Sequence, residues 1–167
     1  FEEVKVSGIK TDGHIFNYQE TADKIIKIYK NYKTLKPMYY TSIMSWDNSP
    51  RRKEGFTSFY GYSLEKFYEW NRELVKQARK NHPEGERFIL VNAWNEWCEG
   101  TCLEPEEKYG YANINMLSRA IFDLPYKNDL KVFNELPKEI SKPKGKIAIQ
   151  IHLYHPDLIK EIKDNLN

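Results

Sequence analysis

The sequence predicts an α/β fold built on a parallel sheet. Two short apolar runs, residues 38–44 and 87–93, have the length of strands, and residues 63–80 between them repeat apolar side chains at helical spacing. Strands that alternate with helices favour a parallel sheet with crossover helices. We therefore expect residues 37–45 and 87–93 to be neighbouring parallel strands, joined by the helix in a right-handed crossover.

Three helices are predicted along the chain. Asn17 has the side chain of an N-cap and is followed by apolar residues at helical spacing as far as residue 32. Ser63 can cap a second helix over residues 63–80. A third helix is expected over residues 111–121, where apolar residues again recur on one face before a proline. Residues 1–16 give no firm expectation.

The strand over residues 87–93 is an almost continuous apolar run, which suits a parallel strand buried on both faces. Each predicted strand is followed by a loop rich in polar and aromatic residues, over residues 46–52 and 94–108. In parallel α/β folds, ligands bind at the edge where the carboxyl ends of the strands meet. The two loops are therefore expected to form one site.

Charge and cysteine content limit the classes of function. The net charge of +2 is too balanced to suggest binding to nucleic acid or to an anionic membrane. The two cysteines, Cys98 and Cys102, form a lone C-x3-C pattern, for which a structural role is favoured over a metal site. We expect no metal and no cofactor. Two thiols alone do not make a disulfide framework, so a reducing compartment is the default.

The expected cellular location depends on whether the sequence contains a transmembrane segment. No run of about 18 apolar residues is present, so no transmembrane segment is expected. We expect a cytoplasmic protein, with peripheral association with the inner membrane as the alternative. The sequence begins at Phe1 rather than at a methionine, and it is interpreted as part of a longer protein.

Two glutamates and two tryptophans lie together after the second strand. Glu96 and Glu99 are three residues apart, beside Trp94, Asn95 and Trp97. A strand would send the two acids to opposite faces, whereas a tight turn would bring their Cβ atoms within about 5–6 Å. Retaining glycosidases hold their carboxyl groups about 5–5.5 Å apart, and repulsion at that distance separates an acid from a base. The alternative is that both are solvated loop residues.

The first loop also has two interpretations. In the functional one, Trp46 is a stacking platform for a sugar ring, Asp47 and Asn48 accept hydrogen bonds from hydroxyls, and Arg51 and Arg52 clamp a phosphate or carboxylate. In the other, the same residues form an Asx turn before a proline, with exposed arginines. Both interpretations stay open on the sequence alone.

The C-terminal part has a different composition. Lysines alternate with prolines and a few acids over residues 123–145, which is typical of a linker. A new strand is predicted over residues 147–154, followed by a helix to the end of the chain. One strand and one helix cannot bury a core of their own, so residues 146–167 are interpreted as the first βα unit of a second α/β domain.

Three blocks of sequence carry a family resemblance. The segments "SWDNSPRR", "LVNAWNEWCEGTCLEP" and "KYGYANINMLSRAI" resemble, in order and spacing, the C-terminal part of the WbsX-type family, over about residues 20–122. These are glycoside-hydrolase-family-99-like proteins of lipopolysaccharide and capsule biosynthesis. The segment "KIAIQIHLYHPDLIKEI" resembles the opening of the rhamnan synthesis protein F family. The first resemblance implies that residues 1–122 are the C-terminal portion of a (β/α)8 TIM-type barrel.

The resemblance also implies roles for the acid pair. Glu96 matches the base that acts on the sugar 2-hydroxyl, and Glu99 matches the general acid that later acts as a base. The implied pathway passes through a 1,2-anhydro sugar and uses no protein nucleophile. Cys98 departs from the pattern, because family 99 glycosidases often have histidine there, and this puts the choice of substrate in doubt. The expected substrate-binding residues are Trp46, Asp47, Asn48, Arg52, Trp94, Asn95, Trp97, Glu104 and Tyr109.

The expected function is a carbohydrate-active domain of bacterial surface polysaccharide biosynthesis, acting on the glycosidic bonds of an oligosaccharide or polysaccharide. One alternative is a glycosyltransferase that uses a nucleotide sugar, although the chain contains no D-x-D motif and no Gly-rich phosphate loop. A second alternative is a non-catalytic glycan-binding barrel, and a third is a structural piece with no activity alone.

Overall fold

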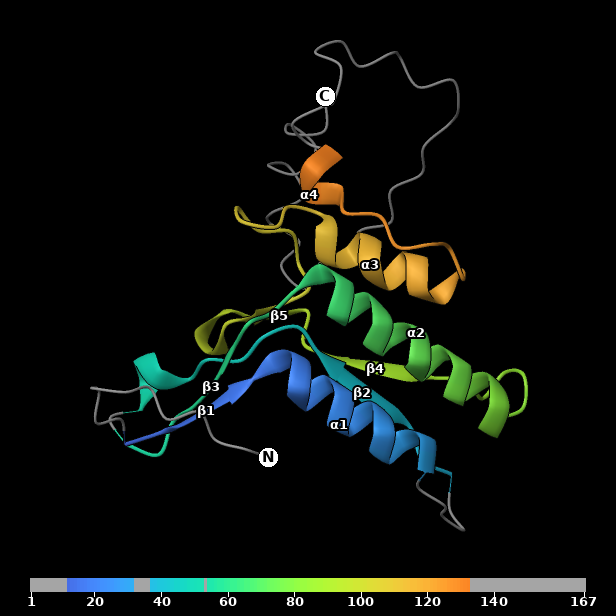
Figure 1. The fold of residues 1–167 in the computed structure, drawn as a ribbon, viewed down its shortest axis with the longest axis horizontal. Helices are drawn as coiled ribbons and strands as arrows, with labels where there is room; N and C mark the ends of the chain where they lie inside the picture. The colour runs from blue at the N-terminus through green and yellow to red at the C-terminus, as the bar shows by residue number, and fades with distance from the viewer. Residues whose placement is uncertain (1–11, 32–36, 53, 133–167) are drawn as a thin grey trace, which may run out of the picture. The chain divides into compact units, whose positions relative to one another are not determined.

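The computed structural model describes residues 12–31, 37–52 and 54–132, all of which lie within one compact unit. The fold of these residues is mixed α/β, with three main helices beside short strand pairs (Figure 1). The larger elements are β1 (His14–Asn17), α1 (Tyr18–Asn31), β2 (Tyr40–Ile43), β3 (Thr57–Tyr60), α2 (Leu64–Asn81), β4 (Ile89–Asn92) and α3 (Ala112–Ile121).

The two strands predicted to be parallel neighbours are confirmed. β2 pairs with β4 in parallel, with Tyr40 opposite Ile89 and Ile43 opposite Asn92. α2 connects them in sequence and packs against both strands. Each strand has four residues, which is shorter than the apolar runs that predicted them.

A second parallel pair was not expected. β1 pairs with β3, with His14 opposite Thr57 and Asn17 opposite Tyr60. Residues 1–16 gave no expectation, and the sequence after the first polar loop was not recognised as a strand. The described residues contain three two-stranded sheets and no closed barrel. The barrel implied by the family resemblance therefore stays a proposal.

Both predicted helix caps are confirmed. The side-chain oxygen of Asn17 accepts hydrogen bonds from the backbone N–H groups of Gln19, at 2.9 Å, and Glu20, at 3.2 Å. The Ser63 hydroxyl accepts one from the backbone N–H of Lys66 at 3.1 Å. Each cap supplies a partner for N–H groups that have none within the first helical turn.

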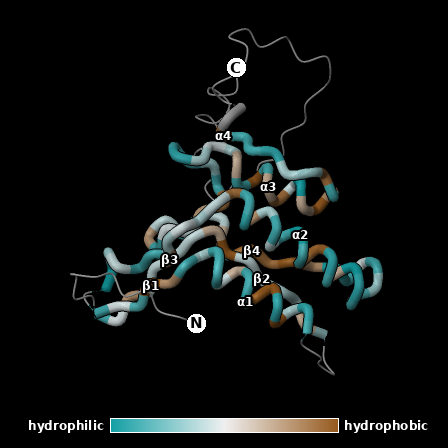
Figure 2. The backbone as a smooth tube through the Cα atoms, in the orientation of Figure 1, coloured by the Kyte–Doolittle hydropathy of each residue, from teal (hydrophilic) through white to brown (hydrophobic). Residues whose placement is uncertain are grey.

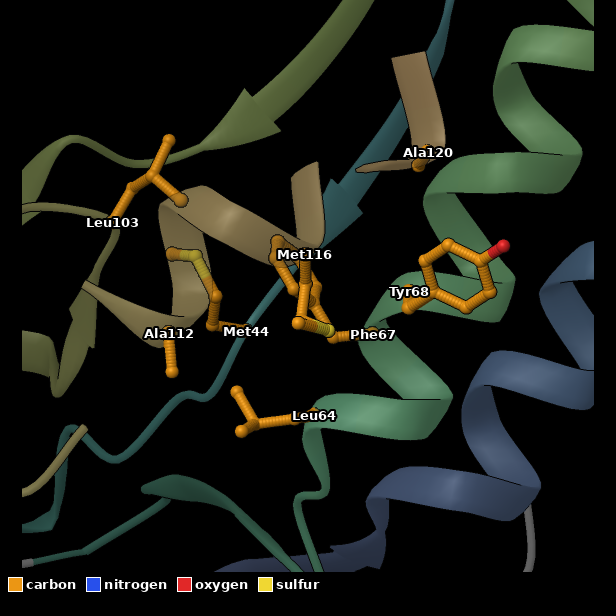
Figure 3. Close-up of a cluster of buried hydrophobic side chains, with 8 residues drawn as sticks. All are labelled: Met44, Leu64, Phe67, Tyr68, Leu103, Ala112, Met116 and Ala120. Atoms are coloured by element: carbon orange, nitrogen blue, oxygen red, sulfur yellow. The ribbon is translucent and has the colours of Figure 1, made fainter. Parts of the chain in front are cut away.

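Helix α2 lies between α1 and α3 and holds the unit together (Figure 1). Figure 2 shows hydrophobic and hydrophilic residues alternating along α2 and a hydrophobic stretch at β4. The apolar face of α2 takes part in two buried clusters. The first joins α2, α3 and the ends of two loops, and consists of Met44, Leu64, Phe67, Tyr68, Leu103, Ala112, Met116 and Ala120 (Figure 3). The second joins α1, α2 and β2, and consists of Tyr18, Ala22, Tyr40, Trp70 and Leu74.

A buried polar pair ties β2 to α2. The Ser42 hydroxyl donates a hydrogen bond to the Asn71 side-chain oxygen at 2.8 Å, and the Asn71 amide donates to the Phe67 carbonyl at 2.8 Å. Both side chains are almost fully buried. Because buried polar groups are costly without partners, this pair fixes how the strand lies against the helix.

The start of the predicted linker packs against the unit. The Tyr68 hydroxyl donates a hydrogen bond to the Leu124 carbonyl at 2.8 Å, and α4 (Asp129–Val132) contacts α3. Residues 133–167 lie outside the described residues, so the linker over residues 123–145 and the domain over residues 146–167 stay predictions. Within the described ranges, no helix is long and apolar enough to cross a membrane.

Candidate active site

The two candidate acids lie on a tight hairpin that follows β4. β5 (Asn95–Glu96) pairs with β6 (Thr101–Cys102) in antiparallel fashion, with Glu96 opposite Thr101. A 3₁₀ turn over Trp97–Glu99 links them, and Gly100 closes the turn in the left-handed region at φ 62°. The chain therefore leaves the strand directly after Glu96, which is the condition under which residues three apart come close.

The hairpin is fixed to the end of β4 by hydrogen bonds. The Thr101 hydroxyl donates to the Asn92 carbonyl at 2.8 Å. The backbone N–H of Leu103 donates to the Ala93 carbonyl at 3.0 Å, and that of Glu104 donates to the Trp94 carbonyl at 2.8 Å. The Asn92–Ala93 peptide bond is cis. These contacts place the acids beyond the carboxyl end of a parallel strand.

The loop after β2 reaches the same hairpin. The backbone N–H of Asp47 donates a hydrogen bond to the Glu99 carbonyl at 2.8 Å. The Arg51 guanidinium donates to the Glu99 carboxylate at 3.1 Å. The two loops that were expected to meet at one edge of the sheet are therefore in direct contact, and Glu99 is held through both its backbone and its side chain.

Polar side chains of the loop over residues 46–52 mostly bind the main chain. An Asp47 side-chain oxygen accepts from the backbone N–H of Ser49 at 2.9 Å, which is an Asx turn. The Asn48 side chain is buried, and its oxygen accepts from the backbone N–H of Thr57 at 2.8 Å. The Trp46 carbonyl accepts from Phe59 at 2.8 Å. These contacts favour the turn interpretation, and sugar binding by Asp47 and Asn48 stays a prediction.

The two glutamates differ in their surroundings. The Glu99 side chain is 20% exposed and is paired with the more exposed Arg51. Glu96 is exposed, and its carboxylate has no hydrogen-bond or ion-pair partner among the residues that the structure describes. Because Arg51 itself is 55% exposed, the ion pair contributes only about 0–1 kcal/mol to stability. Its effect is on the position of the Glu99 carboxylate.

Two tryptophans beside the acids present their rings to solvent. Trp94 is 53% exposed and Trp97 is 54% exposed. The Trp97 indole N–H donates a hydrogen bond to the Glu104 carboxylate at 3.1 Å, which fixes the orientation of the ring. Exposed aromatic rings with restrained orientation are suited to stacking against an apolar ligand face.

A cavity of about 510 Å³ opens beside the hairpin. Two of the expected binding residues, Trp97 and Tyr109, line it, whereas neither Glu96 nor Glu99 does. The other polar and aromatic lining residues were not predicted from the sequence, and they are Ser45, Phe59, Tyr60, Tyr62, Glu106, Lys108 and Asn113. Tyr60 is the last residue of the unrecognised strand β3 and Tyr62 lies two residues beyond it, so recognising that strand would have placed both near the site.

Burial controls the ionisation of two groups in the cavity wall. Burial, with Tyr18, Tyr109 and Glu106 adding, raises the pKa of the Tyr62 phenol well above its ordinary value of 10.0. The Tyr62 hydroxyl therefore stays protonated, and it donates a hydrogen bond to the Asn113 side-chain oxygen at 2.6 Å. Burial likewise raises the pKa of the Cys102 thiol, so this cysteine is a protonated packing residue.

Among the residues that the structure describes, no three or more His, Cys, Asp or Glu side chains are grouped so that they could hold a metal ion. Cys98 is exposed and Cys102 is buried.

The other expected substrate-binding residues, Arg52 and Asn95, are exposed.

Together, the fold and site define an α/β protein with carboxylates and exposed indoles at the ends of its parallel strands. The family described as Glycosyltransferase WbsX matches residues 2–117. The chain belongs to this family, which confirms the WbsX resemblance. The match does not reach the C-terminal segment, so the resemblance to the rhamnan synthesis protein F family stays a prediction.

The chain is also similar to two curated proteins. It is 27% identical over 156 residues to "Uncharacterized protein WxcX" of Xanthomonas campestris pv. campestris strain B100, covering 91% of this chain and 20% of that protein. It is 26% identical to the WxcX protein of another strain of that organism, with the same coverage. The chain thus spans about a fifth of the length of these relatives. No solved structure matches it.

Proposed function

We propose that the chain is the C-terminal portion of a (β/α)8 barrel in a carbohydrate-active enzyme of bacterial surface polysaccharide biosynthesis. Membership of the WbsX family supports the pathway. The two parallel strand pairs, with helices between their strands, support the barrel. Both site loops follow the carboxyl ends of strands β2 and β4. Barrel enzymes have their active sites at the carboxyl ends of the barrel strands, so this position supports an active site formed by the two loops.

The proposed chemistry uses the two glutamates and no cofactor. Glu96 takes the proton of the sugar 2-hydroxyl, whose oxygen bonds to C1 while the bond from C1 to the leaving oxygen breaks. Glu99 gives its proton to that leaving oxygen. An incoming hydroxyl then attacks C1 and passes its proton to Glu99, while the bond from C1 to the 2-oxygen breaks and the 2-oxygen regains its proton from Glu96. Both carboxyl groups return to their starting state, and the configuration at C1 is retained.

One observation carries the proposal: the Glu99 carboxylate is held by Arg51 of the neighbouring loop, while Glu96, across the same turn, is open to solvent. A fixed carboxyl group suits proton transfer to a leaving oxygen, because general acids act through precise placement. The Arg51 guanidinium also offsets the negative charge that Glu99 carries after it has donated its proton. An open carboxylate suits contact with a sugar hydroxyl.

Transfer is the second candidate outcome of the same chemistry. The family is described as a glycosyltransferase, which favours a sugar hydroxyl over water as the incoming group. A nucleotide-sugar donor would need a phosphate site, and the chain contains no D-x-D motif and no Gly-rich phosphate loop. The choice between water and a sugar acceptor is tested by product analysis with and without added oligosaccharide.

The experiment compares Glu99→Gln and Glu96→Gln in the full-length protein. The substrates are a panel of glycosides with an unactivated sugar leaving group and matched aryl glycosides with a very acidic one. Glu99→Gln should slow the first type by roughly 10²–10⁴-fold, the usual share of acid–base catalysis, and largely spare the first step of the second type. Glu96→Gln should slow the first step for both, since the 2-hydroxyl must lose its proton in each.

Equal and small losses for both variants on both substrates would mean that the carboxylates only position hydroxyl groups. In that case the non-catalytic glycan-binding barrel would replace the proposed enzyme. Thermal unfolding of each variant is the control, because a general loss of structure would lower all activities alike.

A further inference from the structure

The cavity beside the hairpin is separate from the carboxylate pair. It lies where the end of β2, the end of β3 and the hairpin come together, and the hairpin contributes Trp97, Gly100 and Cys102. Its volume of about 510 Å³ falls within the range of ligand-binding pockets. Trp97 belongs to the turn between Glu96 and Glu99, so the cavity adjoins the proposed reaction site.

Two exposed aromatic rings in its lining are held in place by hydrogen bonds. Tyr60 is 44% exposed, and its hydroxyl accepts from the Asn17 side-chain amide at 3.1 Å. The exposed Trp97 donates its indole N–H to Glu104 at 3.1 Å. Because these exposed rings are already held in one orientation, a ligand that stacks on them causes little further loss of side-chain entropy, which favours binding.

The charged groups in the lining are engaged within the protein. Both oxygens of the Glu106 carboxylate accept backbone hydrogen bonds, from the N–H groups of Lys108 at 2.7 Å and Tyr109 at 2.5 Å. The Lys108 ammonium lies over the Tyr109 ring, 4.9 Å from its centroid. A charged ligand would have to compete with these contacts, whereas an uncharged one would not.

The polar groups deeper in the lining are neutral. The Tyr62 hydroxyl donates to the Asn113 oxygen at 2.6 Å, and the Asn113 amide lies 3.5 Å from the Cys102 carbonyl. These groups can exchange hydrogen bonds with hydroxyls but supply no charge. Aromatic rings with neutral polar groups match a sugar ring, which has apolar C–H faces and a rim of hydroxyls.

We infer that this cavity is a sugar subsite that holds an uncharged ring of the glycan next to the bond that reacts at Glu96 and Glu99. Tyr60 and Trp97 stack on the faces of that ring, and Asn113 faces its hydroxyls. The inference rests on the proposed function for the role of the two carboxylates. It adds a ligand class and the residues Tyr60 and Asn113, which have no assigned role.

The test uses the full-length protein on an array of neutral hexose and deoxyhexose oligosaccharides and their uronic-acid counterparts. We expect binding to one or more neutral glycans, with weaker binding to the matched charged ones. Binding only to charged glycans, or to none, would overturn the inference. The neutral glycan with the strongest signal is then titrated by calorimetry against single variants.

Tyr60→Ala and Trp97→Ala should each weaken that binding by about tenfold, the loss expected for one aromatic contact worth about 1.4 kcal/mol. Trp97→Phe keeps a ring but loses the hydrogen bond to Glu104, so it should lie between. Phe122→Ala is the matched control, because Phe122 is 71% exposed and does not line the cavity. Unchanged affinity in Tyr60→Ala and Trp97→Ala would overturn the subsite.

Failure of the subsite and failure of the proposed function are distinguishable. If Tyr60→Ala binds normally while Glu99→Gln loses turnover, only the subsite is wrong. If Glu99→Gln keeps full turnover while Tyr60→Ala loses binding, the cavity binds sugar but the carboxylate chemistry is wrong. Glycan binding should survive in Glu99→Gln, because that side chain does not line the cavity.

Discussion

The loops over residues 46–52 and 94–108 occupy equivalent positions but use their side chains differently. Each follows a strand of the parallel β2–β4 pair, and the two touch through Arg51 and Glu99. In the first loop, Asp47 and Asn48 bind backbone N–H groups. In the second, Trp94, Asn95, Glu96 and Cys98 are exposed. The first loop is mainly a support, whereas the second presents its side chains to solvent.

This difference shows why residue type and position together do not define a site. Asp, Asn and Trp at a strand end predict sugar binding, but Asp and Asn also form turns with their own backbone. The deciding property is whether the polar atoms are already paired. Arg51 is the exception in the first loop, since its side chain reaches across to a carboxylate of the second.

The largest effect expected from this comparison is on turnover, from Arg51→Ala in the full-length protein. Loss of the contact leaves the Glu99 carboxylate less precisely placed, and because a misplacement of about 1 Å can cost about 100-fold in rate, kcat should fall about 10- to 100-fold. KM should change little, because the substrate can still bind. Arg51→Lys should retain part of the activity, and added guanidinium should partly restore Arg51→Ala.

Arg52→Ala is the matched variant, because Arg52 is the next residue and is exposed. If it clamps an anionic group of the substrate, as the sequence predicts, KM should rise while kcat stays near the original value. An equal loss of kcat in both variants would mean that the loop contributes only general positive charge, and the proposed positioning role of Arg51 would be wrong.

The second prediction concerns stability, where the supporting loop should be the sensitive one. Asn48→Ala removes the buried acceptor of the Thr57 N–H and should lower the free energy of unfolding by about 1–3 kcal/mol. Asn95→Ala, at an exposed asparagine of the other loop, should stay within about 0.5 kcal/mol. Urea unfolding measures both. Equal losses would contradict the division into a supporting loop and a solvent-exposed loop.

The third prediction concerns the turn that joins the two acids. Gly100 has φ 62°, and an added Cβ would lie 3.7 Å from Asp47, so space is available and backbone strain decides the effect. Gly100→Ala should cost about 1–2 kcal/mol, because residues with a side chain rarely adopt this conformation. Gly100→Asn should cost less, since asparagine tolerates the left-handed region better. Comparable costs for both would show that the neighbouring Asp47, and not the dihedral angle, limits the position.

The sequence predicted the parts of the fold that have strong local signals. The helix caps at Asn17 and Ser63 and the β2–β4 pair follow from side-chain type and periodicity, which act over a few residues. β1 and β3 escaped prediction because neither belongs to a continuous apolar run and their pairing depends on contacts between distant segments. When the local preference for a strand is weak, packing against the rest of the fold decides whether the strand forms.

The candidate site was predictable to a similar degree. The meeting of the two loops follows from parallel strand order, which the sequence indicated. The Arg51–Glu99 contact did not follow, because several arginine positions were possible and side-chain reach depends on loop geometry. The cavity was missed for the same reason, since Tyr60 belongs to the unrecognised strand and Lys108 and Asn113 come from segments whose packing no local pattern gives.

The smallest effect on stability is expected from Trp94→Ala. The indole is 53% exposed, and the contacts that fix this residue run through its backbone carbonyl, which accepts hydrogen bonds from the N–H groups of Leu103 and Glu104. Because the substitution keeps that carbonyl, the free energy of unfolding should change by less than about 0.5 kcal/mol. Glycan affinity should fall measurably if the ring stacks on substrate. A stability loss above about 1 kcal/mol with unchanged affinity would make Trp94 a packing residue, and the contrast between the two loops would then depend on the carboxylates alone.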